Sequence, residues 1–270
     1  MARYKKKRAR QLQHDRFRDT TMGLFDRLGD RLEGRGRTIL YAIVGVVLVA
    51  VIVAIWMTWS RRKADEARRA MGRAITIAAT PLASTPGADP AAPSFATERE
   101  RAQKAIEEFE KVAAKYGDPY RTEARFFIAS NKLVVERDKA INELAELSKS
   151  RNGDIATLAK FALAQAYEND AKYEEAAQLY RELVSQNRVL VTPETANLRL
   201  ALVYNKQGKK KEAADILFQI VDTARKAKDT DGSPLPQSEA AREASRELQK
   251  IDPDRYSRLP PEALPAGLTF

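Results

Sequence analysis

The chain contains no cysteine and only one histidine, His14, among its 270 residues. The absence of cysteine excludes disulfide bonds, thiolate catalysis, zinc–thiolate sites and a lipoprotein anchor. Because the histidine lies near the N-terminus, the rest of the chain has no histidine-based metal site and no Ser-His-Asp triad. The sequence also lacks a glycine-rich phosphate loop of the form G-x-x-x-x-G-K-[ST]. We therefore expect a non-enzymatic protein without cofactors or bound metals.

One long run without charge extends from Thr38 to Trp59 (TILYAIVGVVLVAVIVAIWMTW). At 1.5 Å per residue in a helix, it is long enough to cross the ~30 Å hydrocarbon core of a bilayer. Tyr41 and Trp59 lie at its two ends, where amphipathic rings prefer the headgroup level. A cleaved signal peptide would have a shorter apolar region of ~7–15 residues. The sequence predicts an uncleaved transmembrane helix over residues 38–60.

The formal net charge of +10 is concentrated before this helix. Residues 1–37 carry twelve basic and five acidic side chains. Such a short tail obeys the positive-inside rule, whereas a long folded domain is translocated largely regardless of its charge. We predict that residues 1–37 form a basic cytoplasmic tail and that the C-terminal part lies outside. The opposite orientation, with a cytoplasmic C-terminal part, remains an alternative.

The basic cluster from Arg3 to Arg10 is a candidate for binding anionic lipid, RNA or the ribosome. The preferred interpretation is that it only sets the topology. Nucleic-acid binding is not expected elsewhere in the chain.

A repeating pattern follows the membrane segment. Residues 61–80 are predicted to continue as a helix, and residues 81–96 to form a Pro/Ala-rich linker or loop. Over residues 97–229, alanines recur 35 to 37 positions apart. Each is followed by large apolar residues four and seven positions later, and this spacing places all three residues on one face of a helix. The alanines are Ala105, Ala140, Ala176 and Ala213. Thirteen residues before the last three stand Phe127, Leu163 and Leu200, which indicate a preceding helix. Stacked helix hairpins of this kind form an α-solenoid.

The pattern resembles the tetratricopeptide repeat (TPR). Its unit of ~34 residues has large and small residues in the first helix and an alanine plus an aromatic residue in the second. The best match consists of Leu163, Ala164, Tyr167, Ala176, Tyr180 and Leu183. We therefore predict an all-α chain in which one transmembrane helix precedes three to four TPR-like hairpins over residues 97–229. The helix over residues 61–80 is expected to complete the first hairpin. Residues 230–251 are predicted as a linker and a capping helix, and residues 252–270 as an irregular Pro-rich tail.

A basic tail, one membrane helix and an external repeat domain together are similar to the YfgM-type ancillary subunit of the bacterial SecYEG translocon. This resemblance implies a single-pass protein of the bacterial inner membrane with a periplasmic repeat domain. It further implies a chaperone-like accessory of protein translocation, with the Sec translocon as a candidate partner. The alternative is a structural scaffold of a cell-wall, pilus or outer-membrane assembly that binds one folded partner.

In TPR-like solenoids, the first helices of successive repeats line the concave surface. Residues at the corresponding positions are candidates for binding proteins or unfolded polypeptide. They are Arg125, Lys132, Phe161, Gln165, Asn169, Leu198, Leu202, Asn205 and Lys206. For Phe161, Leu198 and Leu202, ordinary packing between repeats is an equal alternative. The partner and the oligomeric state are not indicated by the sequence.

Overall fold

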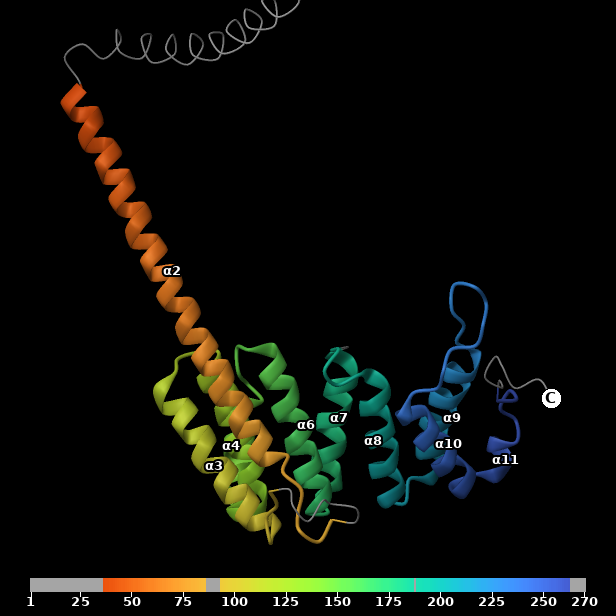
Figure 1. The fold of residues 1–270 in the computed structure, drawn as a ribbon. Helices are drawn as coiled ribbons and strands as arrows, with labels where there is room; N and C mark the ends of the chain where they lie inside the picture. Colours follow the sequence, from red (N-terminus) through yellow and green to blue (C-terminus); the bar gives the residue numbers. More distant parts are fainter. Residues whose placement is uncertain (1–35, 86–92, 187, 263–270) are drawn as a thin grey trace, which may run out of the picture. The chain divides into compact units, whose positions relative to one another are not determined.

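The computed structural model describes residues 36–85, 93–186 and 188–262, and this part of the chain is all-α (Figure 1). The basic-tail predictions therefore lie outside the described residues. The helices are α2 (Gly36–Ala78), α3 (Glu98–Lys115), α4 (Tyr120–Val135), α5 (Arg137–Leu147), α6 (Gly153–Asn169), α7 (Tyr173–Gln186), α8 (Pro193–Lys206), α9 (Lys210–Lys226), α10 (Glu239–Ile251) and α11 (Pro253–Tyr256). The chain divides into two units, Met1–Asp65 and Glu66–Phe270.

The described part of the first unit is the apolar portion of α2. Its large side chains are exposed along the whole run, from Leu40 (58% exposed) to Trp59 (56% exposed). The helix is long and apolar enough to cross a membrane, and none of its apolar window is buried. Burying such a surface in lipid removes it from water, which is the main driving force for insertion. The sequence predicted that the helix continues beyond the membrane segment over residues 61–80, and α2 extends without a break to Ala78.

The second unit begins with the last turns of α2, which pack against α3 and α4. Met71 and Ala74 share one buried cluster with Phe109 and Val112 of α3. Two polar contacts show that the two helices are antiparallel: Lys115 Nζ lies 3.5 Å from Glu66 Oε2, and Arg101 Nη1 donates to the Thr80 carbonyl at 3.2 Å. The prediction that residues 61–80 complete the first hairpin is confirmed. The repeats therefore start within α2, before residue 97.

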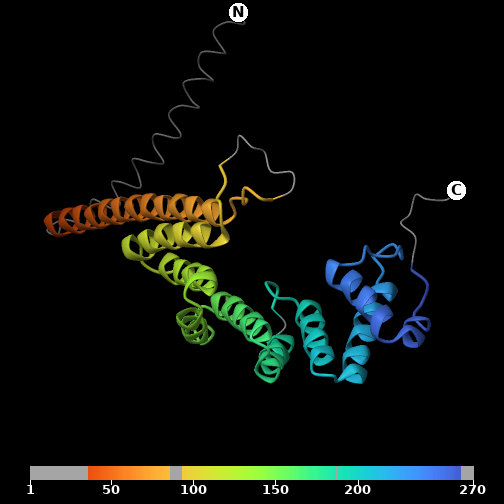
Figure 2. The same cartoon turned by 90° about the horizontal axis from the view of Figure 1, so that it is seen from below.

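Four hairpins follow one another in sequence order: the end of α2 with α3, α4 with α5, α6 with α7, and α8 with α9 (Figure 2). The four recurring alanines of the repeat pattern have no exposed surface. The large residues four positions later, such as Leu144 and Tyr180, are also fully buried. A methyl side chain lets two helix backbones approach closely, while the large residue fills the space between hairpins. This arrangement is a TPR-like solenoid, as the spacing predicted.

The last hairpin is covered by α10. Ala241, Ala244 and Leu248 of this helix are fully buried, as expected for the predicted capping helix. Beyond it, the expectation of an irregular tail from residue 252 is wrong for its first residues, because α11 forms there. Asp252 caps this short helix by accepting a hydrogen bond from Arg255 N at 3.0 Å, and proline is tolerated at the first helical position. Residues 263–270 lie outside the described part.

Candidate functional site

A pocket of about 500 Å³ opens on the first helices of the second and third hairpins. We call it the groove pocket. Its lining residues are Phe126, Ser130, Leu133, Val134, Arg137, Leu158, Phe161, Ala162, Gln165, Ala166, Asn169 and Arg199. Most come from α4 and α6, with one residue each from the start of α5 and from α8. Pockets of this size that combine aromatic and a few polar groups are typical of binding sites.

Two aromatic rings, those of Phe126 and Phe161, line the groove pocket. The ring of Phe161 packs edge-on against Tyr180, with 5.9 Å between ring centroids. Phe126 packs edge-on against Phe127 at 5.4 Å. Edge-to-face pairs at these distances fix the orientation of each ring. The pocket therefore offers preorganised apolar surface to a ligand.

Two arginines lie at its edges. Arg137 donates from Nε to Asp170 Oδ1 at 2.7 Å and from Nη2 to the Ala166 carbonyl at 2.9 Å. Both acceptors belong to the C-terminal end of α6, where the helix dipole favours a cation. These bonds hold the guanidinium in place over the end of the pocket.

The second arginine, Arg199, belongs to a charged cluster centred on Glu168. The Glu168 side chain is only 3% exposed and accepts three hydrogen bonds. They come from Arg199 Nη2 at 2.9 Å, Lys206 Nζ at 2.8 Å and the Tyr180 hydroxyl at 3.1 Å. Burial raises the pKa of the Tyr180 hydroxyl, so this group stays protonated and donates. The cluster joins α6, α7 and α8 and places Arg199 at the pocket.

Of the candidate binding residues, the structure brings Phe161, Gln165 and Asn169 together in the groove pocket. The other candidates lie elsewhere on the first helices. Arg125 and Lys132 both face Glu143 of α5, with N–O distances of 3.4 and 3.7 Å. They therefore link the two helices of their own hairpin.

The remaining candidates belong to the third and fourth hairpins. Leu198 is 3% exposed and lies in the core beneath α10, and Leu202 packs against the same cluster. These contacts agree with the packing alternative for both leucines. Lys206 is bound to Glu168, and Asn205 is half-buried.

Sequence reasoning missed Phe126, Ser130, Leu133, Arg137 and Arg199. The stripe that lines the pocket runs one residue later in the repeat than the stripe chosen from the sequence. In α4 it consists of Phe126, Ser130 and Leu133, and in α6 of Ala162, Ala166 and Asn169, both with i, i+4, i+7 spacing. Arg199 occupies the same repeat position as Phe126 and Ala162, so this register would have found it. Arg137 lies at the start of α5, the second helix of its hairpin, so the repeat position of the first helices does not identify it.

No protein-family model matches the chain, and no curated protein matches it. Two crystal structures are similar to it, both of a kinesin light chain-like protein of Podosopora anserina with nearly identical TPR-like repeats. Each is 19% identical, covers 60% of this chain and 82% of its own, and superposes with a TM-score of 0.46.

Proposed function

We propose that this chain is a membrane-anchored, non-enzymatic scaffold that binds extended polypeptide in the groove pocket. The observation that carries this proposal is the paired stripe on α4 and α6, which lines one continuous pocket with aromatic, amide and hydroxyl groups. Helical-repeat solenoids use surfaces of this kind to bind other proteins.

The chemistry of the groove pocket suits a chain segment with an apolar side chain. Phe126 and Phe161 supply a surface for that side chain, and burial gains about 25 cal/mol per Å² of apolar area. The Gln165 and Asn169 amides each offer both donors and acceptors, which match the peptide groups of an extended ligand. An unfolded polypeptide presents both apolar side chains and free peptide groups, repeated every few residues.

For the cellular role we propose an accessory of protein translocation, similar to the YfgM-type translocon subunit. In this proposal, the apolar part of α2 anchors the chain in the bacterial inner membrane with its N-terminus in the cytoplasm. The repeats then receive unfolded chains on the periplasmic side, beside the Sec translocon. The exposed apolar surface of α2 supports the anchor, and the groove pocket supports the affinity for unfolded chains.

The test is binding of a fluorescent, permanently unfolded polypeptide to the full chain in detergent micelles, measured by anisotropy. The double variant Gln165→Ala/Asn169→Ala should weaken binding about thirtyfold, because two hydrogen bonds of about 1 kcal/mol each are lost. The matched control is Gln178→Ala/Gln186→Ala, which removes two exposed amides from α7 outside the pocket.

The control should bind as the parent does, and both variants should keep the parental melting temperature. Equal affinity in all three chains contradicts the proposal. Binding of one folded partner in place of unfolded chains points instead to a structural scaffold of an envelope assembly.

A further inference from the structure

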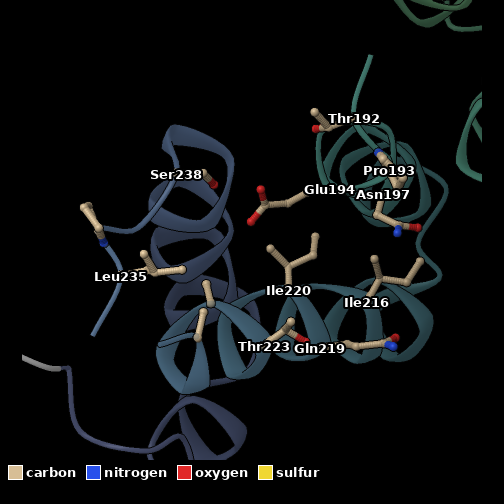
Figure 3. A pocket seen from close by; sticks show the side chains of 13 residues that line it. Thr192, Pro193, Glu194, Asn197, Ile216, Gln219, Ile220, Thr223, Leu235 and Ser238 are labelled. Atoms are coloured by element: carbon tan, nitrogen blue, oxygen red, sulfur yellow. The ribbon is translucent and has the colours of Figure 1, made fainter. Parts of the chain in front are cut away.

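A second pocket of about 500 Å³ lies on the fourth hairpin (Figure 3). We call it the hairpin pocket. It is bounded by the start of α8, by α9 and by residues 227–238, which join α9 to α10. It shares no lining residue with the groove pocket. Its occupant is therefore a separate question from the proposed function.

The hairpin pocket combines an apolar floor with one carboxylate. Ile216, Ile220 and Ala224 follow one another at four-residue spacing on one face of α9. The Glu194 side chain of α8 reaches into the cavity toward Ile220 (Figure 3). Among the described residues that line the pocket, Glu194 is the only charged one, and no described residue forms an ion pair with it. The pocket thus presents an uncompensated negative charge beside apolar surface.

The third hairpin shows what fills the equivalent place in the repeat. Lys160 Nζ of α6 donates to Glu182 Oε2 of α7 at 2.7 Å, and the lysine side chain is only 14% exposed. The aliphatic stem of a lysine packs against apolar surface while its ammonium group meets a polar partner. This place between the two helices of a hairpin therefore accommodates a lysine side chain paired with a carboxylate.

The fourth hairpin lacks this lysine. The two repeats lie 37 positions apart, so Asn197 stands at the position of Lys160. In the same register, Gln219 stands at the position of Glu182. Both amides line the hairpin pocket. The shorter, uncharged asparagine leaves the space of the lysine stem open.

A carboxylate nevertheless remains at this place. Glu194 precedes Asn197 by three positions, and residues at this spacing lie on the same face of a helix. The hairpin pocket therefore has the acidic partner and the apolar floor that a lysine requires, but no cation of its own among the described lining residues.

We propose that the hairpin pocket binds a lysine or arginine side chain of a polypeptide partner, in a segment whose neighbouring residues are apolar. The stem of the basic side chain lies on Ile220, and its cationic head pairs with the Glu194 carboxylate. The amide oxygens of Asn197 and Gln219 are further acceptors. An apolar neighbour in the segment covers Leu235, which is 46% exposed. Repulsion from Glu194 disfavours an acidic segment.

The test is binding of a fluorescent peptide, Ala-Leu-Lys-Leu-Ala with blocked ends, to the full chain in detergent micelles, measured by anisotropy. A second peptide carries norleucine in place of lysine, which keeps the stem and removes the charge. Glu194→Gln should weaken binding of the lysine peptide at least about tenfold, because a charge-assisted hydrogen bond is lost. It should leave the affinity for the norleucine peptide unchanged. The matched control is Glu175→Gln, an exposed glutamate of α7 outside the pocket lining, which should bind both peptides as the parent does.

A second variant, Asn197→Lys/Gln219→Glu, rebuilds in the fourth hairpin the ion pair of the third. It should fill the pocket and weaken binding of the lysine peptide at least about tenfold, for the same reason, at the parental melting temperature. Parental affinity of this variant overturns the proposal, as does equal weakening of both peptides by Glu194→Gln. Self-association of the full chain that Glu194→Gln abolishes, seen by analytical ultracentrifugation, would assign the pocket to a second copy and also overturns it. Because these variants leave the groove pocket intact, their outcome is independent of the test of the proposed function.

Discussion

Glu168 Oε2 accepts a hydrogen bond from Arg199 Nη2 at 2.9 Å and thereby joins the first helices of two consecutive hairpins. The carboxylate is almost fully buried, whereas the side chain of Arg199 is 27% exposed. A buried charge of this kind is tolerated only when it is paired and hydrogen-bonded. Tyr180 and Lys206 supply the other two bonds. This acidic side chain therefore links α6 to α8.

Replacing this side chain should destabilise the repeat unit. Glu168→Ala removes the common acceptor of Arg199, Lys206 and Tyr180 and leaves the latter hydroxyl buried without its acceptor. We expect the free energy of unfolding to fall by about 3 kcal/mol, as for other broken buried ion pairs. Urea unfolding, monitored by circular dichroism, measures this change in the free energy of unfolding. Glu175→Ala, an exposed glutamate of the same hairpin, is the control and should change stability by less than about 0.5 kcal/mol.

Enlarging a recurring alanine should also destabilise the fold. Ala176 is fully buried at the close contact between helices, so Ala176→Leu forces additional atoms into a filled core. Overpacking of this type costs about 1–3 kcal/mol. Thermal unfolding of the variant checks the value against Gln178→Leu, which adds a leucine to an exposed position of the same helix. Similar melting temperatures for the two variants would contradict the repeat packing described above.

The buried hydroxyl of Tyr180 predicts a change of stability in alkali. An unfolded tyrosine has a pKa of about 10, and burial raises the pKa of Tyr180 above that value in the folded state. Below pH ~10 the hydroxyl is protonated in both states, and its contribution to stability is complete. Above this pH the unfolded chain releases a proton that the folded chain retains. The free energy of unfolding therefore falls as the pH rises, by up to about 1.4 kcal/mol per pH unit from this group.

Urea unfolding between pH 9 and 11.5 measures this slope. Tyr180→Phe removes the titrating group and should show a shallower decline than the parent. Gln178→Ala, which changes an exposed and non-titrating side chain on the same helix, is the control and should keep the parental slope. A Tyr180→Phe variant that declines as steeply as the parent would assign the alkaline loss of stability to other groups.

Protease access in intact cells tests the proposed orientation. With the outer envelope opened, an added protease should digest the repeat unit, while an epitope at the N-terminus survives. The physical reason is that the short basic tail is retained on the cytoplasmic side. A cytoplasmic marker protein that remains intact is the control. A protected repeat unit would put the repeats in the cytoplasm and remove the translocation proposal.

The sequence by itself determined the all-α class, the apolar helix and the hairpin repeats. These features are local periodicities of apolar and small residues, such as Ala176 followed by Tyr180, and local periodicity depends only on helix geometry. Even the first hairpin could be predicted, because α2 keeps its apolar stripe after the membrane segment.

Only the tertiary structure decided which stripe of the first helices lines the groove pocket. The stripe chosen from the sequence was one residue away from the stripe that lines the pocket. A shift of one residue rotates a side chain by about 100° around a helix. The partners of Glu168 lie 12 to 38 positions along the chain, so no local pattern identifies them. Likewise, the α11 region is placed by contacts with α9, such as that of Arg225 with the Pro260 carbonyl. Such long-range contacts depend on how whole hairpins pack against one another, because helices that are far apart in the sequence contribute to their energy together.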